Sequence, residues 1–318
     1  MSHFLTVPIN ENGVVTDGSI QNDLTLSMRP PFNFSDVLIY SHGWWTSSAR
    51  CMGEYNRFTI EFAKLIRTLA ASLPKPPQRE ALGIGVHWPS MLSEDDDAIV
   101  NYAQALSFYT MEKRADTVGE HAVYSFLRMI LEARSGDPNP LRLHWIGHSF
   151  GCKVVCSALQ EIIQDGLAIP ATLTLNAVLL QAALDDNDLE SEDIYGKLAA
   201  NLPSLRLLVT RSDLDTALQK WYPIAHLANF FGSKVSRVAL GARGPTQAVI
   251  NQFGGVGTVD VGTGFQSSAI VNVEQRLVVA NLTPIHQSAA GEADSFSGHH
   301  SDIFHDEIYT LIAGFLFK

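Results

Sequence analysis

Residues 147–151 read Gly147-His148-Ser149-Phe150-Gly151, which is a G-x-S-x-G pattern. The apolar run Leu141–Ile146 precedes the pattern, and a helical pattern over Cys152–Ile163 follows it. This context predicts a strand, a sharp turn and a helix, which together form a nucleophile elbow. Such a turn strains the backbone of its central residue and needs glycines where side chains would collide. The sequence therefore predicts Ser149 as a nucleophile exposed at the end of a strand.

Apolar runs and longer helical patterns alternate from about Val37 onward. This alternation predicts an α/β fold with a mostly parallel central sheet and helices on both faces. Residues before Pro31 are expected to supply edge strands, and Asp302–Phe317 a closing amphipathic helix. We expect a single domain over residues 1–318 with cap-like insertions at about 90–115 and 215–270. Further strands are expected at Val37–Tyr40, Leu82–Trp88, Ala177–Gln181, Leu205–Thr210 and Arg276–Asn281.

A serine hydroxyl becomes a good nucleophile when a base takes its proton and a third group holds that base in one tautomer. Asp213 follows the strand predicted at 205–210, and His300 follows the last predicted strand. We therefore predict Ser149, Asp213 and His300 as the catalytic residues. The alternative acids are Asp185 and then Asp215, and the alternative base is His299. His42 and His148, which flank the expected catalytic backbone, are expected to orient or pack.

The order of these three residues along the chain is the one that α/β-hydrolases use. From Val37 to Phe317 the chain resembles the α/β-hydrolase superfamily, and specifically poorly characterised bacterial members. The shared features are an oxyanion-side His42-Gly43, the Gly-His-Ser-Phe-Gly elbow and a terminal His300-Ser301-Asp302. The resemblance implies an α/β-hydrolase fold and a serine hydrolase mechanism, but it says little about the substrate.

The resemblance also implies which backbone groups form an oxyanion hole. One donor is the N–H of the residue after the nucleophile, here Phe150, at a helix N-terminus that favours negative charge. The second is expected from the turn after an earlier strand, here Trp44. The chain has no Gly-Gly continuation after His42-Gly43, so the glycine-rich hole of lipases is not matched.

Aromatic residues near the predicted strand ends favour a neutral, partly hydrophobic acyl substrate. We predict that Trp45 and Trp88 contact the substrate at the carboxyl edge of the sheet, where α/β folds bind ligands. Other residues expected to converge there are Trp44, Phe108, Tyr109 and Met111. Hydrolysis of a carboxylic ester through an acyl-enzyme on Ser149 is the leading function. The alternatives are an acyltransferase or thioesterase with the same triad, or a catalytically silent hydrolase-like binding protein.

The amino-acid composition excludes some classes of binding partner. A net charge of -11 without a dense tract of Lys or Arg argues against nucleic acid or an anionic membrane as the main partner. No stretch is apolar and uncharged for long enough to span a bilayer, and Met1–Ile9 lacks a signal pattern, so we expect a cytoplasmic protein without a membrane anchor. No disulfide, cofactor or metal is expected. The histidines lack zinc-binding spacing, and the Gly-rich run Phe253–Gly257 lacks the Lys-Ser/Thr of a phosphate loop.

Overall fold

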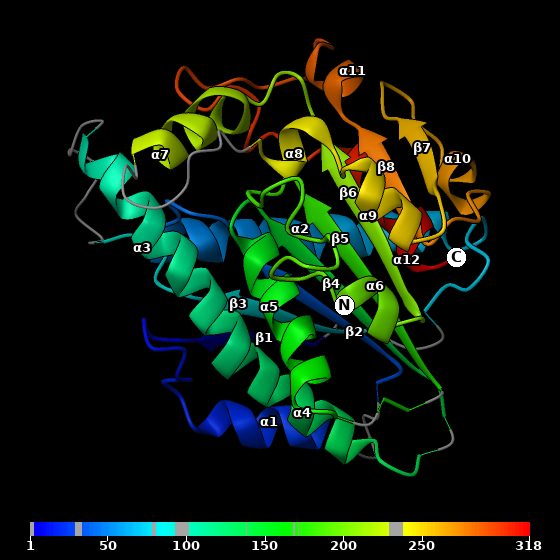
Figure 1. The fold of residues 1–318 in the computed structure, drawn as a ribbon. Coiled ribbons are helices and arrows are strands. Elements are labelled where there is room, and N and C mark those ends of the chain that lie inside the picture. Colours follow the sequence, from blue (N-terminus) through cyan, green and yellow to red (C-terminus); the bar gives the residue numbers. More distant parts are fainter. Residues whose placement is uncertain are drawn as a thin grey trace.

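The computed structural model describes residues 3–28, 34–77, 81–92, 102–137, 139–167, 169–170, 172–228 and 238–318. Within them, eight strands form one sheet in the order β1-β3-β2-β4-β5-β6-β8-β7, and all neighbours are parallel (Figure 1). The mostly parallel sheet predicted from the sequence is therefore confirmed. The strands are β1 (His3–Pro8), β2 (Asp36–Ser41), β3 (Leu82–His87), β4 (Leu141–His148), β5 (Leu173–Leu180), β6 (Leu205–Arg211), β7 (Val256–Asp260) and β8 (Leu277–Asn281).

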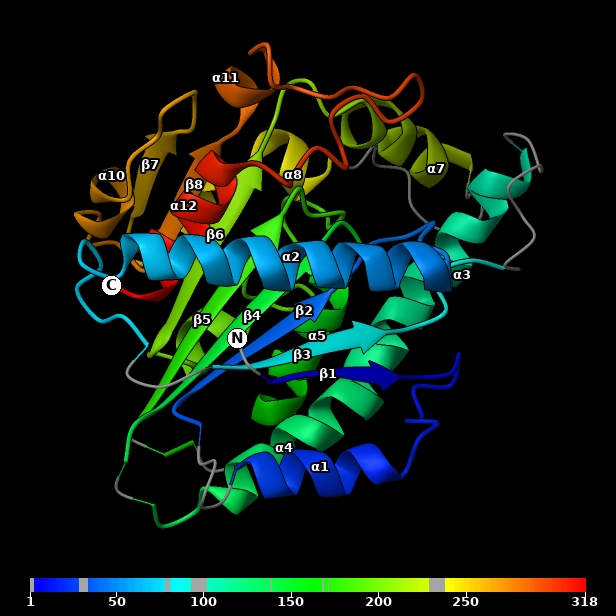
Figure 2. The same ribbon diagram turned by 180° about the vertical axis from the view of Figure 1, so that it is seen from behind.

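Helices cover both faces of the sheet. One face carries α1 (Ser19–Ser27), α3 (Tyr102–Val118), α4 (Tyr124–Ala133) and α5 (Gly151–Gln164), with the π-helical turn η2 (Gly119–Val123) between α3 and α4 (Figure 1). The other face carries α2 (Ser48–Leu69) and α12 (Asp306–Leu316) (Figure 2). The shorter helices are α6 (Leu198–Asn201), η3 (Ala217–Trp221), α7 (Tyr222–Ala228), α8 (Leu240–Arg243), α9 (Gln247–Gln252), α10 (Ser268–Val271) and α11 (Thr283–His286).

Two hydrophobic cores lie on the two sides of the sheet because successive side chains of a strand point to opposite faces. On β4, Leu143 and Trp145 pack with the core that contains α3, α4 and α5. Ile146 packs with the core that contains α2 and α12. The strand that leads into the elbow is thus buried on both sides, which gives Ser149 a rigid base.

Some predicted boundaries differ from the observed ones. The closing helix begins at Asp306 rather than Asp302, because the Asp302 carboxylate binds His299 and His305 and belongs to the preceding loop. The first predicted insertion contains the start of α3, and its residues 93–101, including the acidic run from Glu94 to Asp97, lie outside the described residues. The second predicted insertion, residues 215–270, includes β7, which is an edge strand of the sheet, and its residues 229–237 lie outside the described residues.

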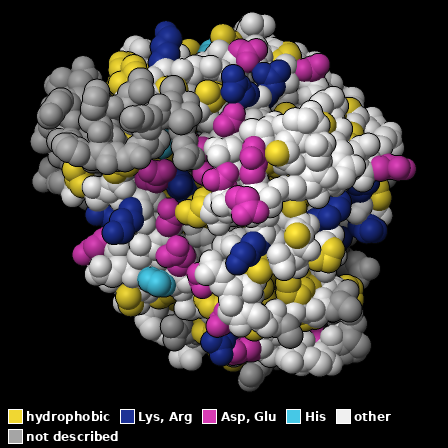
Figure 3. Space-filling model, viewed as in Figure 1, with side chains coloured by type: hydrophobic (Ala, Val, Ile, Leu, Met, Phe, Trp, Pro, Cys, Tyr) yellow, Lys and Arg dark blue, Asp and Glu magenta, His cyan; other side chains and the backbone are white. Residues whose placement is uncertain are grey.

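The distribution of charged side chains on the surface matches the lack of a dense Lys or Arg tract in the sequence. On the face shown in Figure 3, Lys and Arg side chains are scattered among Asp and Glu. Among the described residues, no helix is both long enough and apolar enough to cross a membrane.

A buried ion pair joins β2 to β4 at their amino ends, away from the elbow. Asp36 on β2 is fully buried, and its Oδ1 lies 2.7 Å from Nε of Arg142 and 3.2 Å from Nε2 of His144, both on β4. Burial alone would raise the pKa of Asp36, but the hydrogen bonds and charges of His144 and Arg142 hold it below its usual value. The interaction therefore stabilises the fold most when Asp36 is charged.

We predict that Asp36→Ala lowers the free energy of unfolding by about 3 kcal/mol at neutral pH, because it leaves the Arg142 guanidinium without its buried partner. Since the folded pKa lies below the unfolded one, this stabilisation is fully present above pH of about 4 and is lost as the pH falls through the folded pKa. Urea unfolding at several pH values tests this. A difference between variant and wild type that stays constant as the pH falls would contradict it.

Candidate active site

The strand, turn and helix predicted around Ser149 are present. Ser149 lies between β4 and α5 and has a φ of 55°, a conformation that residues with a side chain rarely adopt. Its N–H donates to the carbonyl of Leu180 at the end of β5 (3.0 Å). At Gly151, an added Cβ would lie only 2.2 Å from the carbonyl oxygen of Ser41 at the end of β2. Glycine at this position is therefore what allows the turn to pack against β2 and hold the strain at Ser149.

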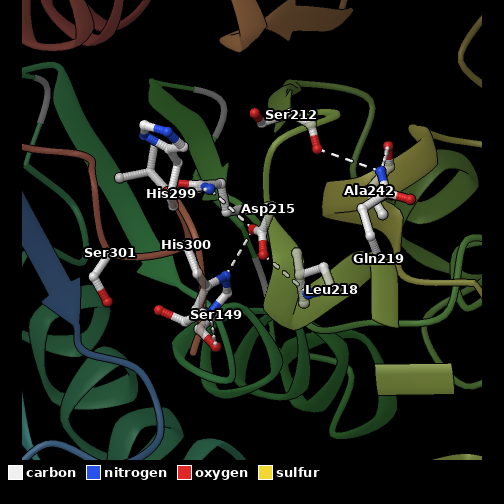
Figure 4. Close-up of polar contacts among 12 residues, drawn as sticks. Ser149, Ser212, Asp215, Leu218, Gln219, Ala242, His299, His300 and Ser301 are labelled. Carbon is white, nitrogen blue, oxygen red and sulfur yellow. Dashed lines mark hydrogen bonds and ion pairs between the residues drawn. The ribbon is translucent and has the colours of Figure 1, made fainter. Parts of the chain in front are cut away.

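A chain of hydrogen bonds links Ser149 to a histidine and a carboxylate (Figure 4). Nε2 of His300 lies 2.8 Å from Oγ of Ser149, and Nδ1 of His300 lies 2.7 Å from Oδ2 of Asp215. His300 belongs to the loop between α11 and α12, and Asp215 follows β6. In the tautomer that suits both contacts, Nδ1–H donates to the carboxylate and Nε2 accepts the serine proton.

The Asp215 carboxylate has two further donors. The amide Nε2 of Gln181 donates to Oδ2 at 2.9 Å, and the N–H of Leu218 donates to Oδ1 at 2.9 Å. The side chain is completely shielded from solvent. Three hydrogen bonds therefore replace the hydration that this carboxylate loses on burial.

Asp213, the acid preferred from the sequence, does not contact His300. Its side chain is 61% exposed and pairs with Arg211 (Nη1–Oδ1, 3.0 Å). The turn after β6 directs Asp213 outward, whereas Asp215 forms an antiparallel bridge with Gly298, two residues before His300. The prediction of Asp213 beside the histidine is therefore wrong. Asp215 could have been recognised as a helix-start residue, since an Asp three residues before Leu218 suits the N-cap of the following turn.

Asp185 and His299 also make their contacts away from Ser149. Asp185 accepts a hydrogen bond from the hydroxyl of Tyr222 (3.0 Å). The ring of His299 is stacked on His286, and its Nδ1 lies 2.8 Å from Oδ2 of Asp302. His300 is thus the histidine that contacts Ser149, as the sequence predicts.

The two backbone N–H groups predicted as oxyanion donors belong to residues beside Ser149. Within the described part of the chain, the N–H groups of Trp44 and Phe150 take part in no hydrogen bond. Gly43 brings the Trp44 turn close, because a Cβ at Gly43 would lie 2.7 Å from Cβ of Ser149. The N–H of Trp45 is already used, since it donates to the carbonyl of Ser90 (3.1 Å).

Two buried histidines orient this backbone, as expected. Nε2–H of His148 donates to the carbonyl of His300 (2.8 Å), and Nδ1–H of His42 donates to the carbonyl of Gly43 (2.8 Å). Burial lowers the pKa of each to about 3, so both rings are neutral at ordinary pH. They hold the histidine loop and the Trp44 turn without adding charge to the site.

Ser149 and His300 open into a cavity of about 420 Å³ with a largely aromatic wall. Trp45 lines it, as predicted, but Trp88 does not. Trp88 is only 1% exposed, stacks on the ring of His42 and donates from Nε1 to the carbonyl of His42 (3.2 Å). Trp88 therefore supports the Trp44 turn from beneath. The aromatic residues of the wall are Trp44, Trp45, Phe108, Phe150, Trp221, Tyr222 and Phe296.

Several residues that the sequence singles out take no direct part in the cavity. The hydroxyl of Tyr109 donates to the carbonyl of Ala225 (2.8 Å), and Met111 is buried in the core. Cys51, Cys152 and Cys156 are buried, and none of the three forms a disulfide within the described part of the chain. Among the described residues, no three His, Cys, Asp or Glu side chains are arranged to hold a metal ion.

We predict that Gly151→Ala destabilises the protein by about 2 kcal/mol or more, because the carbonyl of Ser41 is backbone and cannot move away cheaply. Gly53→Ala is the matched control. Gly53 lies in α2 with nothing near its missing Cβ, so alanine there should stabilise the helix by up to about 1 kcal/mol. Urea unfolding measures both. Equal stabilities of the two variants would show that the elbow does not need this close approach.

Comparison with known proteins identifies the family of this chain. A family model described as an alpha/beta hydrolase of unknown function (DUF900) matches residues 33–275, a range that includes Ser149 and Asp215 and ends before His300. Among solved structures, the chain is similar to an extracellular alpha/beta-hydrolase from a Paenibacillus species, titled as sharing structural and functional homology with tobacco salicylic acid binding protein 2. The match has 14% identity and a TM-score of 0.20, and it covers 53% of each chain, about half of that structure's length. No curated protein matches the chain. The family match confirms the predicted α/β-hydrolase fold class.

Proposed function

Because the chain belongs to this alpha/beta hydrolase family, we propose that it is a serine hydrolase that cleaves carboxylic esters through an acyl-enzyme on Ser149. The observation that carries the proposal is the continuous hydrogen-bond chain from Oγ of Ser149 through His300 to Asp215, with distances of 2.8 Å and 2.7 Å. A nucleophile, a base and a buried acid in this geometry are the parts that acyl transfer needs.

In the proposed first half-reaction, Oγ of Ser149 attacks the ester carbonyl carbon while Nε2 of His300 accepts the hydroxyl proton. Asp215 stabilises the imidazolium that forms and keeps Nδ1 protonated. The N–H groups of Trp44 and Phe150 donate to the carbonyl oxygen as it becomes an oxyanion. The tetrahedral intermediate then collapses, the carbon–oxygen bond to the alcohol breaks, and His300 gives its proton to the departing alcohol oxygen.

The second half-reaction repeats these steps with water. His300 takes a proton from the water as its oxygen attacks the acyl carbon, and then returns a proton to Oγ of Ser149 as the carboxylic acid leaves. An apolar acyl group would suit this cavity, because the wall beside the two N–H donors is made of Trp44, Phe108 and Phe150.

We predict that a fluorophosphonate probe labels the protein once, at Ser149, and that Ser149→Ala abolishes the labelling. The reason is that the probe reacts only with an activated serine. Ser157→Ala is the control, because Ser157 lies on the helix that follows the elbow but is bonded to Asp116, outside the cavity. Mass spectrometry of the labelled peptide locates the adduct. Labelling that persists in Ser149→Ala would refute the assignment.

Asp215→Asn should lower kcat by about 10⁴-fold, whereas Asp213→Asn should leave it nearly unchanged. The N–H of Leu218 donates to Oδ1 and His300 contacts Oδ2, so an asparagine oxygen held by Leu218 would place the amide nitrogen against Nδ1 of His300. The histidine would then carry its proton on Nε2 and could not accept one from Ser149. Steady-state kinetics with p-nitrophenyl butyrate tests the pair. A large loss in Asp213→Asn with a mild effect in Asp215→Asn would reverse the roles.

A further inference from the structure

A second cavity of about 560 Å³ adjoins the aromatic one, and the two share Arg50, Asp294 and Ser301 as lining residues. Its wall is mostly polar and charged. Besides the shared residues it includes Arg57, Glu292, Asp302 and His305. Ser149 and His300 line the aromatic cavity, and the polar cavity lies beside it across the three shared residues.

The chemistry of the triad decides which part of a substrate each compartment would receive. The histidine must give its proton to the departing alcohol oxygen, so the alcohol lies on the histidine side of the serine. The polar cavity is on that side, because Gly298, Ser301 and Asp302 of the His300 loop line it. The acyl group lies toward the oxyanion donors, where the wall is aromatic.

Both signs of charge occur on the polar wall. Nε of Arg50 donates to the Glu54 carboxylate (2.9 Å), and its Nη2 lies 3.5 Å from Oγ of Ser301. Nε of Arg57 donates to the Glu61 carboxylate (3.4 Å), and its Nη2 donates to the carbonyl of Phe304 (3.3 Å). Since a guanidinium has five N–H donors, each arginine retains donors beyond these contacts.

Acceptors alternate with these donors. Glu292 and Asp294 are exposed residues on the same wall, and the Asp294 carboxylate also accepts from the N–H groups of Phe296 and Ser297. Because guanidiniums and carboxylates lie on the same wall, neither an anionic nor a cationic alcohol would meet charges of only the opposite sign there. A neutral hydroxyl both donates and accepts, so several hydroxyls can satisfy a wall of this composition.

We infer that the polar cavity is the leaving-group subsite for a neutral polyhydroxylated alcohol, such as glycerol or a sugar. This inference rests on the proposed ester hydrolase function. The substrate class it names is an ester that joins an apolar acyl group to a polyol.

The test compares butyryl esters that differ only in the alcohol: glycerol monobutyrate, n-butyl butyrate, butyrylcholine and butyryl lactate. The wild type should show the highest kcat/KM with the glycerol ester, by on the order of tenfold over the butyl ester. Arg57→Gln and, independently, Glu292→Gln should remove most of this preference by raising KM for the glycerol ester more than KM for the butyl ester. Two substitutions at different points of the wall keep the test valid if one variant fails to fold.

Arg128→Gln is the matched control. Arg128 is an exposed arginine on α4 that pairs with Glu132 four residues later, as Arg50 pairs with Glu54, but it lines neither cavity. Its ester preference should equal that of the wild type. Equal rates with glycerol and butyl esters, or a preference for the choline or lactate ester, would overturn the subsite while fluorophosphonate labelling of Ser149 still stood. Absence of that labelling would instead overturn the proposed hydrolase and the subsite with it.

Discussion

The buried carboxylate of Asp215 is the group on which the rest of the site depends. Its three donors come from separate parts of the chain: Gln181 after β5, Leu218 in η3 and His300 in the loop before α12. An unpaired charge without access to water would cost several kcal/mol, so these three partners together stabilise the charged carboxylate in the folded state. The same contacts that satisfy the carboxylate therefore fix the histidine against Ser149.

The loop that carries His300 is held at several other points. Gln181 also donates to the carbonyl of His299 (2.9 Å), and His148 donates to that of His300. Although burial opposes it, hydrogen bonds from His305 and His299 lower the pKa of Asp302 to about 2, so this carboxylate stays charged at ordinary pH. The position of His300 is thus a property of a network, and removing one contact leaves the others in place.

The sequence identifies two of the three residues in this chain of hydrogen bonds for physical reasons. Ser149 is recognisable because an elbow needs glycines at fixed places. His300 is recognisable because it follows the last central strand and directly precedes Ser301-Asp302 and the closing helix, as in the enzymes that the chain resembles. Asp215 ranks below Asp213 and Asp185 on sequence grounds, because a count of residues after a strand does not determine which way a turn directs each side chain. The bridge between Asp215 and Gly298 joins segments that are far apart in sequence, and no local pattern indicates it.

The position of Trp88 and the existence of strand β7 also could not be predicted from the sequence. The position of Trp88 beneath the Trp44 turn depends on its partner His42, and tertiary packing brings these two residues together. The strand β7 is short and only partly buried, so its sequence lacks the apolar run that marks the central strands.

Acid-quenched mass spectrometry during turnover of p-nitrophenyl butyrate tests the central claim most directly, because it observes the covalent intermediate itself. The expected result is a single butyryl group on the peptide that contains Ser149, present in the wild type during turnover and absent from Ser149→Ala. Turnover without any acyl adduct, or an adduct on a different residue, would contradict the claim that Ser149 is the nucleophile.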